Sequence, residues 1–149
     1  MFLQIEGIDG ESKDDKHPDW IEVESFYMST SQMWIGGLDQ LVIDISISKH
    51  IDKSTPKIME KCAKFEAIPS VVLEFCQAGG TKTVFCKYEL SDVVVSSFQT
   101  SGDITSDVRP SESITLSFGS IEVTYYEIDE FGVKGTVVFT WDSETGVIG

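Results

Sequence analysis

The stretch from Leu41 to Leu90 constrains the fold most, because it predicts a strand, a helix and a hairpin in direct succession. Between residues 41 and 47, apolar residues alternate with mostly polar ones, which is typical of a strand with one buried face. Ser54, Thr55 and Pro56 then predict the start of a helix. Either hydroxyl can accept a hydrogen bond from a first-turn N–H, and proline suits the first helical position.

The predicted helix covers about residues 55–66 and has an apolar stripe beside a charged face. The stripe consists of Ile58, Met59, Cys62 and Phe65, and the charged face consists of Lys57, Glu60, Lys61 and Lys64. We expect Pro69 to end the helix. Because the sequence predicts no other long helix, this one must lie against strands.

The hairpin that follows has a register that its apolar residues predict. If the chain turns at residues 78–81, pairing Phe75 with Val84 places the apolar residues of both strands on one face. Glycines at the turn suit a backbone that needs positive φ. The other pairs in this register are Leu73 with Cys86 and Val71 with Tyr88.

The same register leaves three apolar residues on the opposite face of the hairpin. These are Val72, Cys76 and Phe85. In an isolated monomer these apolar side chains would be exposed to water, whereas neighbouring subunits of a closed ring would cover them. We therefore predict a subunit interface at these residues.

The remainder of the chain predicts further short strands, which brings the total to about eight. The phase of the alternation changes at Gly119–Ser120, which predicts a bulge inside one strand. About eight strands and one helix favour a small antiparallel β-barrel or two-sheet sandwich. We expect residues 1–141 to form a single domain and residues 142–149 to be a loose tail.

Between Met28 and Gln40 the alternation fails, which predicts a loop. The loop carries Met33, Trp34 and Ile35 at its tip. Apolar residues at a loop tip suggest a contact surface.

Charge and cysteine content exclude several classes. The net charge is −14, with 25 acidic residues against 11 basic ones, which argues against a nucleic acid or an anionic membrane as partner. No run approaches the ~18 apolar residues of a membrane span, and residues 1–6 lack the pattern of a secretory signal. None of the 3 cysteines is expected to face another, so we predict free thiols and a reducing compartment.

Candidate chemical sites in the sequence are weak. Asp9, Glu11, Asp14 and Asp15 do not have the spacing of a calcium loop. His17 precedes a proline and His50 ends a strand, and neither has a visible partner that would make it a catalytic base. Residues 79–83 lack the order of a phosphate-binding loop. We expect no catalytic residues, no metal and no cofactor.

Several motifs occur together in one order along the chain. They are Gly10-Glu11-Ser12 with His17 and residues 20–23, then residues 51–57, Ala78-Gly79-Gly80, residues 92–97, 109–113 and 118–122. In this order and spacing the chain resembles the haemolysin-coregulated proteins (Hcp), the tube subunits of bacterial type VI secretion. The resemblance covers about residues 2–141.

The resemblance implies a small β-barrel with a flanking helix, six copies of which close into a ring. Rings stack into a hollow tube, and the segment after Gln32, shorter here than in many members, is the family's usual stacking element. Met33, Trp34 and Ile35 are therefore the predicted stacking residues. The implied partners are further copies, the spike, sheath and baseplate proteins, and effectors in the lumen. The tube would assemble in the bacterial cytoplasm and be expelled.

We interpret the chain as a structural, self-assembling protein without catalysis. A phage-like tail-tube protein is one alternative. A carbohydrate-binding or hydrolytic β-sandwich is a second, and it would need a concave aromatic patch near paired carboxylates. The candidate residues for such a patch are Tyr125, Tyr126, Glu122 and Glu127.

Overall fold

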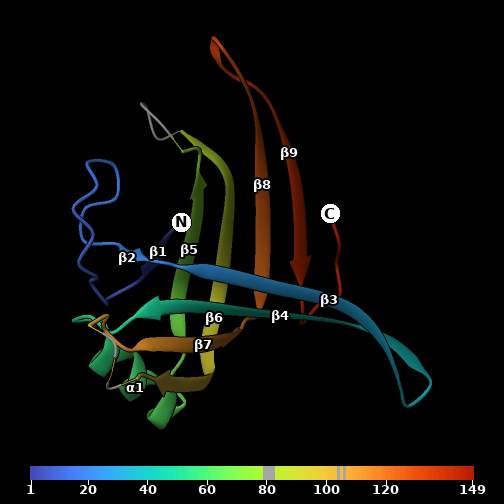
Figure 1. Cartoon of the computed structure of the whole chain (residues 1–149). Helices are drawn as coiled ribbons and strands as arrows, with labels where there is room; N and C mark the ends of the chain where they lie inside the picture. The colour runs from blue at the N-terminus through green and yellow to red at the C-terminus, as the bar shows by residue number, and fades with distance from the viewer. Residues whose placement is uncertain (79–82, 104, 106) are drawn as a thin grey trace.

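A computed structural model describes the whole chain except residues 79–82, 104 and 106 and the side chain of Ile35. The described residues form nine antiparallel strands and one helix (Figure 1), which confirms the predicted fold class with one strand more than expected. The helix α1 spans Thr55–Lys64. The strands are β1 (Phe2–Ile5), β2 (Ile21–Glu22), β3 (Ser25–Ile35), β4 (Leu38–His50), β5 (Ile68–Cys76), β6 (Val84–Ser101), β7 (Ser111–Ser117), β8 (Ser120–Asp129) and β9 (Gly132–Asp142).

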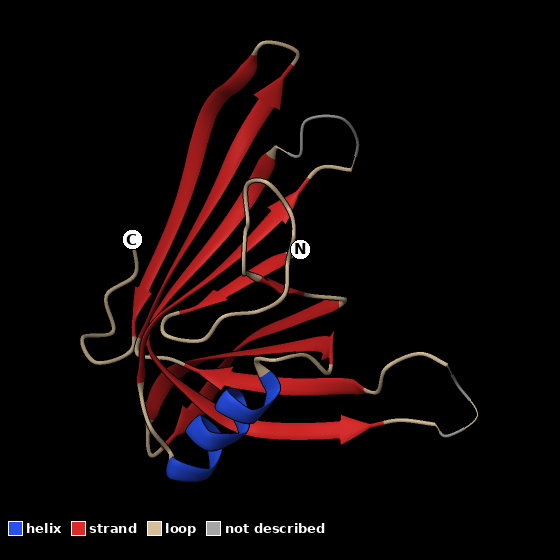
Figure 2. Ribbon diagram, turned by 90° about the vertical axis from the view of Figure 1, so that its left-hand side faces the viewer, coloured by secondary structure: helices blue, strands red, loops and turns tan. Residues whose placement is uncertain are grey.

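The strands form two sheets that share β6. The first sheet contains β2, β1, β5, the N-terminal half of β6, β8 and β9. The second contains the C-terminal half of β6, then β7, β4 and β3. In Figure 1 the strands β5, β8 and β9 run vertically, and β3, β4 and β7 run across the view. Figure 2 shows the two sheets diverging, with α1 lying along the second.

The chain crosses between the sheets at a corner formed by Asp92 and Gly119. Asp92 has a φ of 52°, at the point where β6 leaves β8 and begins to pair with β7. The N–H of Gly119 donates to the carbonyl oxygens of Ser91 (2.9 Å) and Asp92 (3.2 Å). The predicted bulge at Gly119–Ser120 is therefore wrong: β7 and β8 are separate strands in different sheets.

The core lies between the two sheets. The alternation predicted for residues 41–47 is confirmed, since Ile43, Ile45 and Ile47 are buried on one face of β4. Ile21 of β2 is buried in this core, and Phe26 of β3 packs against it. Other core residues are Leu3, Ile5, Ile8, Val23, Ile58, Ile68, Val71, Leu73, Leu90, Val93, Val95, Ile114, Leu116 and Ile121.

The helix begins where predicted, but a different side chain supports its start. Neither Ser54 nor Thr55 caps a first-turn N–H; instead Oδ1 of Asp52 accepts the N–H of Ser54 at 2.9 Å. The helix ends at Lys64 with Phe65 in the left-handed conformation. Pro69 lies inside β5, so its predicted role in ending the helix is wrong.

The charged face of α1 is confirmed, whereas its apolar stripe is only partly buried. Glu60 forms ion pairs with Lys64 (2.6 Å) and Lys57 (3.4 Å), and Ile58 is fully buried. Met59 and Phe65 are exposed, because the second sheet covers only one side of the helix.

From Val71 to Phe75 the β5–β6 hairpin has the predicted faces, but its register is shifted by two residues. Phe75 pairs with Cys86 rather than Val84, and Leu73 pairs with Tyr88. An irregularity follows Phe75, after which Cys76 pairs with Val84. A two-residue shift preserves which side chains face the core, so apolar periodicity alone did not distinguish the registers. Most of the predicted turn lies outside the described residues.

The predicted loop between Met28 and Gln40 is wrong, because this stretch is the outer part of a long hairpin. β3 and β4 pair continuously from Ser25 to Ile35, and only Gly36 and Gly37 connect them. Both glycines have positive φ (61° and 89°), as a tight two-residue hairpin requires. The hairpin extends beyond the body of the molecule (Figure 1).

Candidate assembly surfaces

The tip of the β3–β4 hairpin presents apolar side chains to solvent. Trp34 is 73% exposed, and Met33 and Leu38 are also exposed. The backbone of Ile35 pairs with Leu38, directly beside the turn. Because the two strands are hydrogen-bonded to their ends, the tip is held on a ladder rather than on a loop. The arrangement can insert an apolar contact into a neighbouring surface.

The predicted interface residues occupy different positions in the first sheet. Val72 lies in the middle of β5, where it pairs with Gln4 of β1, and Cys76 ends the same strand. Phe85 lies at the irregularity in β6, and its ring centroid is 6.4 Å from that of Phe75. Phe85 thus contacts a residue that packs against the core, which differs from its expected place on the opposite face. All three predicted residues are half-buried.

The β8–β9 hairpin carries a larger exposed apolar set that sequence reasoning missed. Phe131, at the turn, is 90% exposed. The exposed residues along the two strands are Tyr125, Val133, Val137, Val138 and Phe139. The run 137–139 could have indicated this surface, since consecutive apolar residues in a strand place apolar side chains on both faces.

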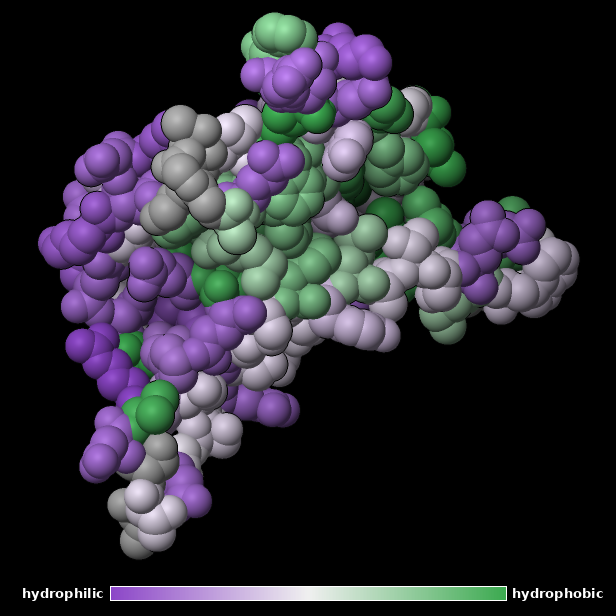
Figure 3. Space-filling view, turned by 45° about the horizontal axis from the view of Figure 1, so that its top comes forward, coloured by the Kyte–Doolittle hydropathy of each residue, from purple (hydrophilic) through white to green (hydrophobic). Residues whose placement is uncertain are grey.

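Figure 3 shows how these surfaces are distributed on one side of the molecule. Hydrophobic residues occupy its middle and upper right, whereas the N-terminal side is hydrophilic. The contrast separates an apolar region suited to protein contact from a charged, solvated one.

His17 has partners that the sequence did not reveal. Its Nδ1 lies 2.7 Å from Oδ2 of Asp14, and its Nε2 lies 2.6 Å from Oε2 of Glu74 on β5. The ring is buried, stacks on Phe2 and meets Trp20 edge-on. Both partners are carboxylates and neither is a nucleophile, so they do not contradict the expectation that His17 has no partner for nucleophile activation. The cluster ties the loop before β2 to the first sheet, which is a structural role.

Lys49 is fully buried at the end of β4. Its Nζ lies 2.7 Å from Oε2 of Glu112 on β7 and 3.0 Å from Oδ1 of Asp52. It also donates to the carbonyl oxygen of His50 at 2.9 Å. The Glu112 side chain is fully buried too. This ion cluster joins β4, β7 and the segment that leads into α1.

His50 lies at the surface beside a cleft of about 340 Å³. Its Nδ1 donates to the carbonyl oxygen of Arg109 at 3.0 Å, and its Nε2 contacts the carboxylate of Glu24. Glu11, on the same cleft, accepts the N–H of Lys53 at 3.2 Å. These contacts join loops to strand ends, and the described lining contains no nucleophile paired with a base.

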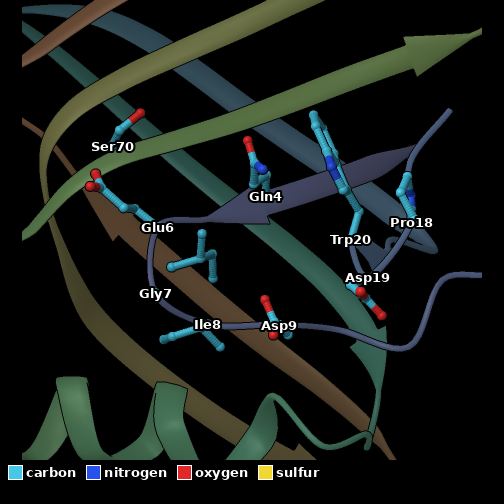
Figure 4. A pocket seen from close by; sticks show the side chains of 10 residues that line it. Gln4, Glu6, Gly7, Ile8, Asp9, Pro18, Asp19, Trp20 and Ser70 are labelled. Atoms are coloured by element: carbon cyan, nitrogen blue, oxygen red, sulfur yellow. The ribbon is translucent and has the colours of Figure 1, made fainter.

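A second cleft, of about 310 Å³, lies beside β1 (Figure 4). Gln4, Trp20 and Ser70 line it together with residues 5–9 and 18–19. Its carboxylates, Glu6 among them, are exposed. The side chains in Figure 4 form a polar depression in which no nucleophile is paired with a base.

The acidic loop does not gather its carboxylates around one point. Asp14 turns inward to His17, whereas Glu11 lies near Arg109, at 3.6 Å. Among the residues whose placement is described, no group of histidine, cysteine, aspartate and glutamate could hold a metal ion.

The carbohydrate-site candidates on β8 do not share a face. Tyr125 and Tyr126 are neighbours in one strand, so their side chains point to opposite faces. Glu127 lies 3.6 Å from Lys134 on β9. The concave aromatic patch that a carbohydrate site would need is not formed by these residues.

Cys62, Cys76 and Cys86 are each partly buried, and none of the three forms a disulfide bond. Burial raises the pKa of the Cys86 thiol above its usual value. This disfavours the reactive thiolate form.

Two antiparallel sheets with the long edge strands β3 and β9 and with apolar hairpin tips are suited to a structural protein that acts by association. Over residues 2–125 the chain matches the family described as "Type VI secretion system effector, Hcp". The chain belongs to this Hcp family of type VI secretion, whose members are structural, non-enzymatic, secreted proteins.

Individual relatives agree with this assignment. The chain is 35% identical to Protein hcp1 of Pseudomonas aeruginosa, with 99% of this chain and 96% of that protein covered. It is similar to the crystal structure of Hcp1 from Salmonella typhimurium, with a TM-score of 0.83 and 30% identity, covering 99% of this chain and 97% of that one.

A structure described as "a type six secretion system protein" has a TM-score of 0.89 at 26% identity, over 99% of this chain and 98% of that chain. A type VI effector from Yersinia pestis shares the fold, with a TM-score of 0.80 and 23% identity over 95% of this chain and 98% of that chain.

Among the described residues, no helix has the length and apolar character to cross a membrane.

Proposed function

We propose that this protein is a tube subunit of a type VI secretion system, six copies of which close into a ring. The observation that carries the proposal is the pair of edge strands β3 and β9, each 11 residues long, beside exposed apolar side chains. The outer edge of β3, the part of the β9 edge before Phe139 and the apolar patches invite association with a second copy. Head-to-tail contacts that close into a ring would cover both the strand edges and the apolar patches in every copy.

Within the ring, Val72, Cys76 and Phe85 are the interface residues that the sequence suggests. The β8–β9 surface, with Val137 70% exposed, adds a second candidate contact. The two sets lie on the same sheet, linked through β6. By this pairing Val137 shares a face with Tyr125, Cys86 and Phe75, whereas Val72 lies on the opposite face. The two sets would therefore be covered by the two different neighbours that each subunit has in a ring.

Rings would stack through the β3–β4 tip, at Met33, Trp34 and Ile35. The charge of −14 on each chain makes successive rings repel one another, so stacking must depend on short-range apolar contacts. The exposed Trp34 ring is suited to such a contact. The stacked tube would contact spike, sheath and baseplate proteins, would carry effectors in its lumen, and would leave the bacterial cytoplasm with the contractile machine.

A mass measurement tests the ring. Light scattering coupled to size exclusion should give a mass close to six chains for the wild type. Val137→Lys, which places a charge on the exposed β9 surface, should shift this mass toward one chain with an unchanged melting temperature. Lys134→Ala, on the same strand, is the matched control and should retain the ring. A monomeric wild type with a cooperative melt would contradict the proposal.

A further inference from the structure

The outer edge of β9 is divided into two parts. On its inner side, β9 pairs with β8 along its length. Backbone N–H groups of a strand alternate between its two sides, so the N–H groups of Thr136, Val138, Thr140 and Asp142 point outward. In the described part of the chain, only the last two have acceptors, and the tail provides them.

A tight turn after β9 reverses the chain onto this edge. The Oδ1 atom of Asp142 accepts the N–H groups of Glu144 and Thr145, both at 2.9 Å. The N–H of Gly146 donates to the carbonyl oxygen of Asp142 at 2.9 Å. Gly146 has a φ of 69°, which only glycine adopts without cost.

The reversed segment then pairs with β9 as a short antiparallel strand. Thr140 and Gly149 exchange two backbone hydrogen bonds of 2.9 Å, and the N–H of Asp142 donates to the carbonyl oxygen of Val147 at 3.1 Å. Trp141 and Ile148 face each other between them. The tail that the sequence predicted to be loose is thus hydrogen-bonded to the barrel.

A further contact fixes the base of the turn to the corner between the sheets. Both the N–H and the hydroxyl of Ser143 donate to the carbonyl oxygen of Gly119, at 2.8 and 2.7 Å. Trp141, just before the turn, meets Phe118 edge-on with 6.2 Å between ring centroids. The tail is therefore anchored at its base as well as along β9.

We infer that residues 143–149 form a built-in cap on the C-terminal end of the β9 edge. By occupying these backbone groups, the cap prevents another strand from pairing there. A strand that joins β9 from outside could therefore pair only with the part of β9 before Phe139. The cap lies within one chain, so it does not depend on the ring proposed above.

Amide exchange tests the cap directly. In the wild type, the N–H groups of Thr140 and Asp142 should exchange slowly. In a chain ending at Asp142, they should exchange at least about tenfold faster, because a backbone group without an acceptor is open to water. The N–H groups of Tyr125 and Val123, which pair with β9 from the inner side, are the matched internal controls and should not change. Unchanged exchange at Thr140 would overturn the inference.

Association provides the second measurement. At equal concentration, the truncated chain should sediment as larger and more heterogeneous species than the wild type, because more of the edge is free. Identical sedimentation of the two chains would contradict the cap. A monomeric wild type would contradict the ring but would leave the exchange test intact.

A full-length variant covers the case in which truncation prevents folding. Asp142→Ala removes the acceptor that holds the turn, and it should speed the exchange of Thr140 without shortening the chain. Glu144→Ala changes an exposed neighbour in the same turn and should exchange like the wild type. Equal protection of Thr140 in both variants would count against the cap.

Discussion

The ammonium group of Lys49 lies 2.7 Å from Oε2 of Glu112, and both side chains are fully buried although 63 positions separate them in the sequence. Removing one partner leaves the other charge buried without compensation. Lys49→Met should therefore lower the free energy of unfolding by about 3–5 kcal/mol. The double variant Lys49→Met/Glu112→Leu should recover part of this loss, since it removes the buried Lys49–Glu112 pair as a whole and leaves only Asp52 without its ion pair. Denaturant unfolding of the wild type, of Lys49→Met, of Glu112→Leu and of the double variant measures the coupling between the two side chains. If the losses of the two single variants simply add up in the double variant, the coupling is contradicted.

Phe65 should be a site where glycine stabilises the protein. Its φ of 53° is left-handed, and its ring is 74% exposed, so the side chain gains little from packing. Phe65→Gly should raise the free energy of unfolding by about 1 kcal/mol. Phe65→Ala removes the same ring but keeps the Cβ atom, so it should give no such gain. Thermal melts of both variants distinguish relief of backbone strain from loss of the ring.

The start of α1 should depend on Asp52 rather than on the hydroxyl groups. Asp52 accepts the N–H of Ser54 and also contacts Lys49. Asp52→Ala should cost at least the ~1 kcal/mol typical of losing a cap. Ser54→Ala should cost less, because its hydroxyl caps no first-turn N–H and only donates to the Asp52 carboxylate. The reverse order in chemical denaturation would show that the Asp52 turn is dispensable.

The tail should loosen in acid. The N–H of Thr145 holds the pKa of the Asp142 carboxyl below its usual value, and the N–H of Glu144 adds to this. A lowered pKa means that the contribution to stability is present above the usual aspartate value near 4 and is lost as pH falls through the lowered value. NMR shifts of the Gly149 amide should report the loss. Asp142→Asn keeps an acceptor oxygen without the titration, so its tail should respond less.

Salt should strengthen ring stacking. Added salt shortens the reach of charge repulsion to about 8 Å near physiological ionic strength, while apolar burial is retained. Trp34→Ala should reduce stacking without dissolving single rings. Electron micrographs across a salt series measure tube length. Tubes that shorten as salt rises would indicate that opposite-charge pairs hold the stack. If Trp34→Ala rings stack like the wild type, the β3–β4 tip is not the stacking contact.

Much of the fold was predictable because local periodicity specifies it. The alternation around Ile45 and the charged face around Glu60 each depend on residues close in sequence, and both are confirmed. The family could also be identified, because ordered motifs along the chain carry it.

Other features were decided only by the tertiary structure. The register that pairs Phe75 with Cys86 differs from the predicted one by two residues, and both registers bury the same faces. Alternation along β4 places Lys49 on the buried face with Ile47, but nothing near it in sequence identifies Glu112 as its partner. Likewise His17 meets Glu74 only because β1 pairs with β5 and brings the N-terminal loop beside that strand. Sequence patterns specify which face of an element is apolar, whereas the choice of partner for a buried charge depends on how distant elements pack together.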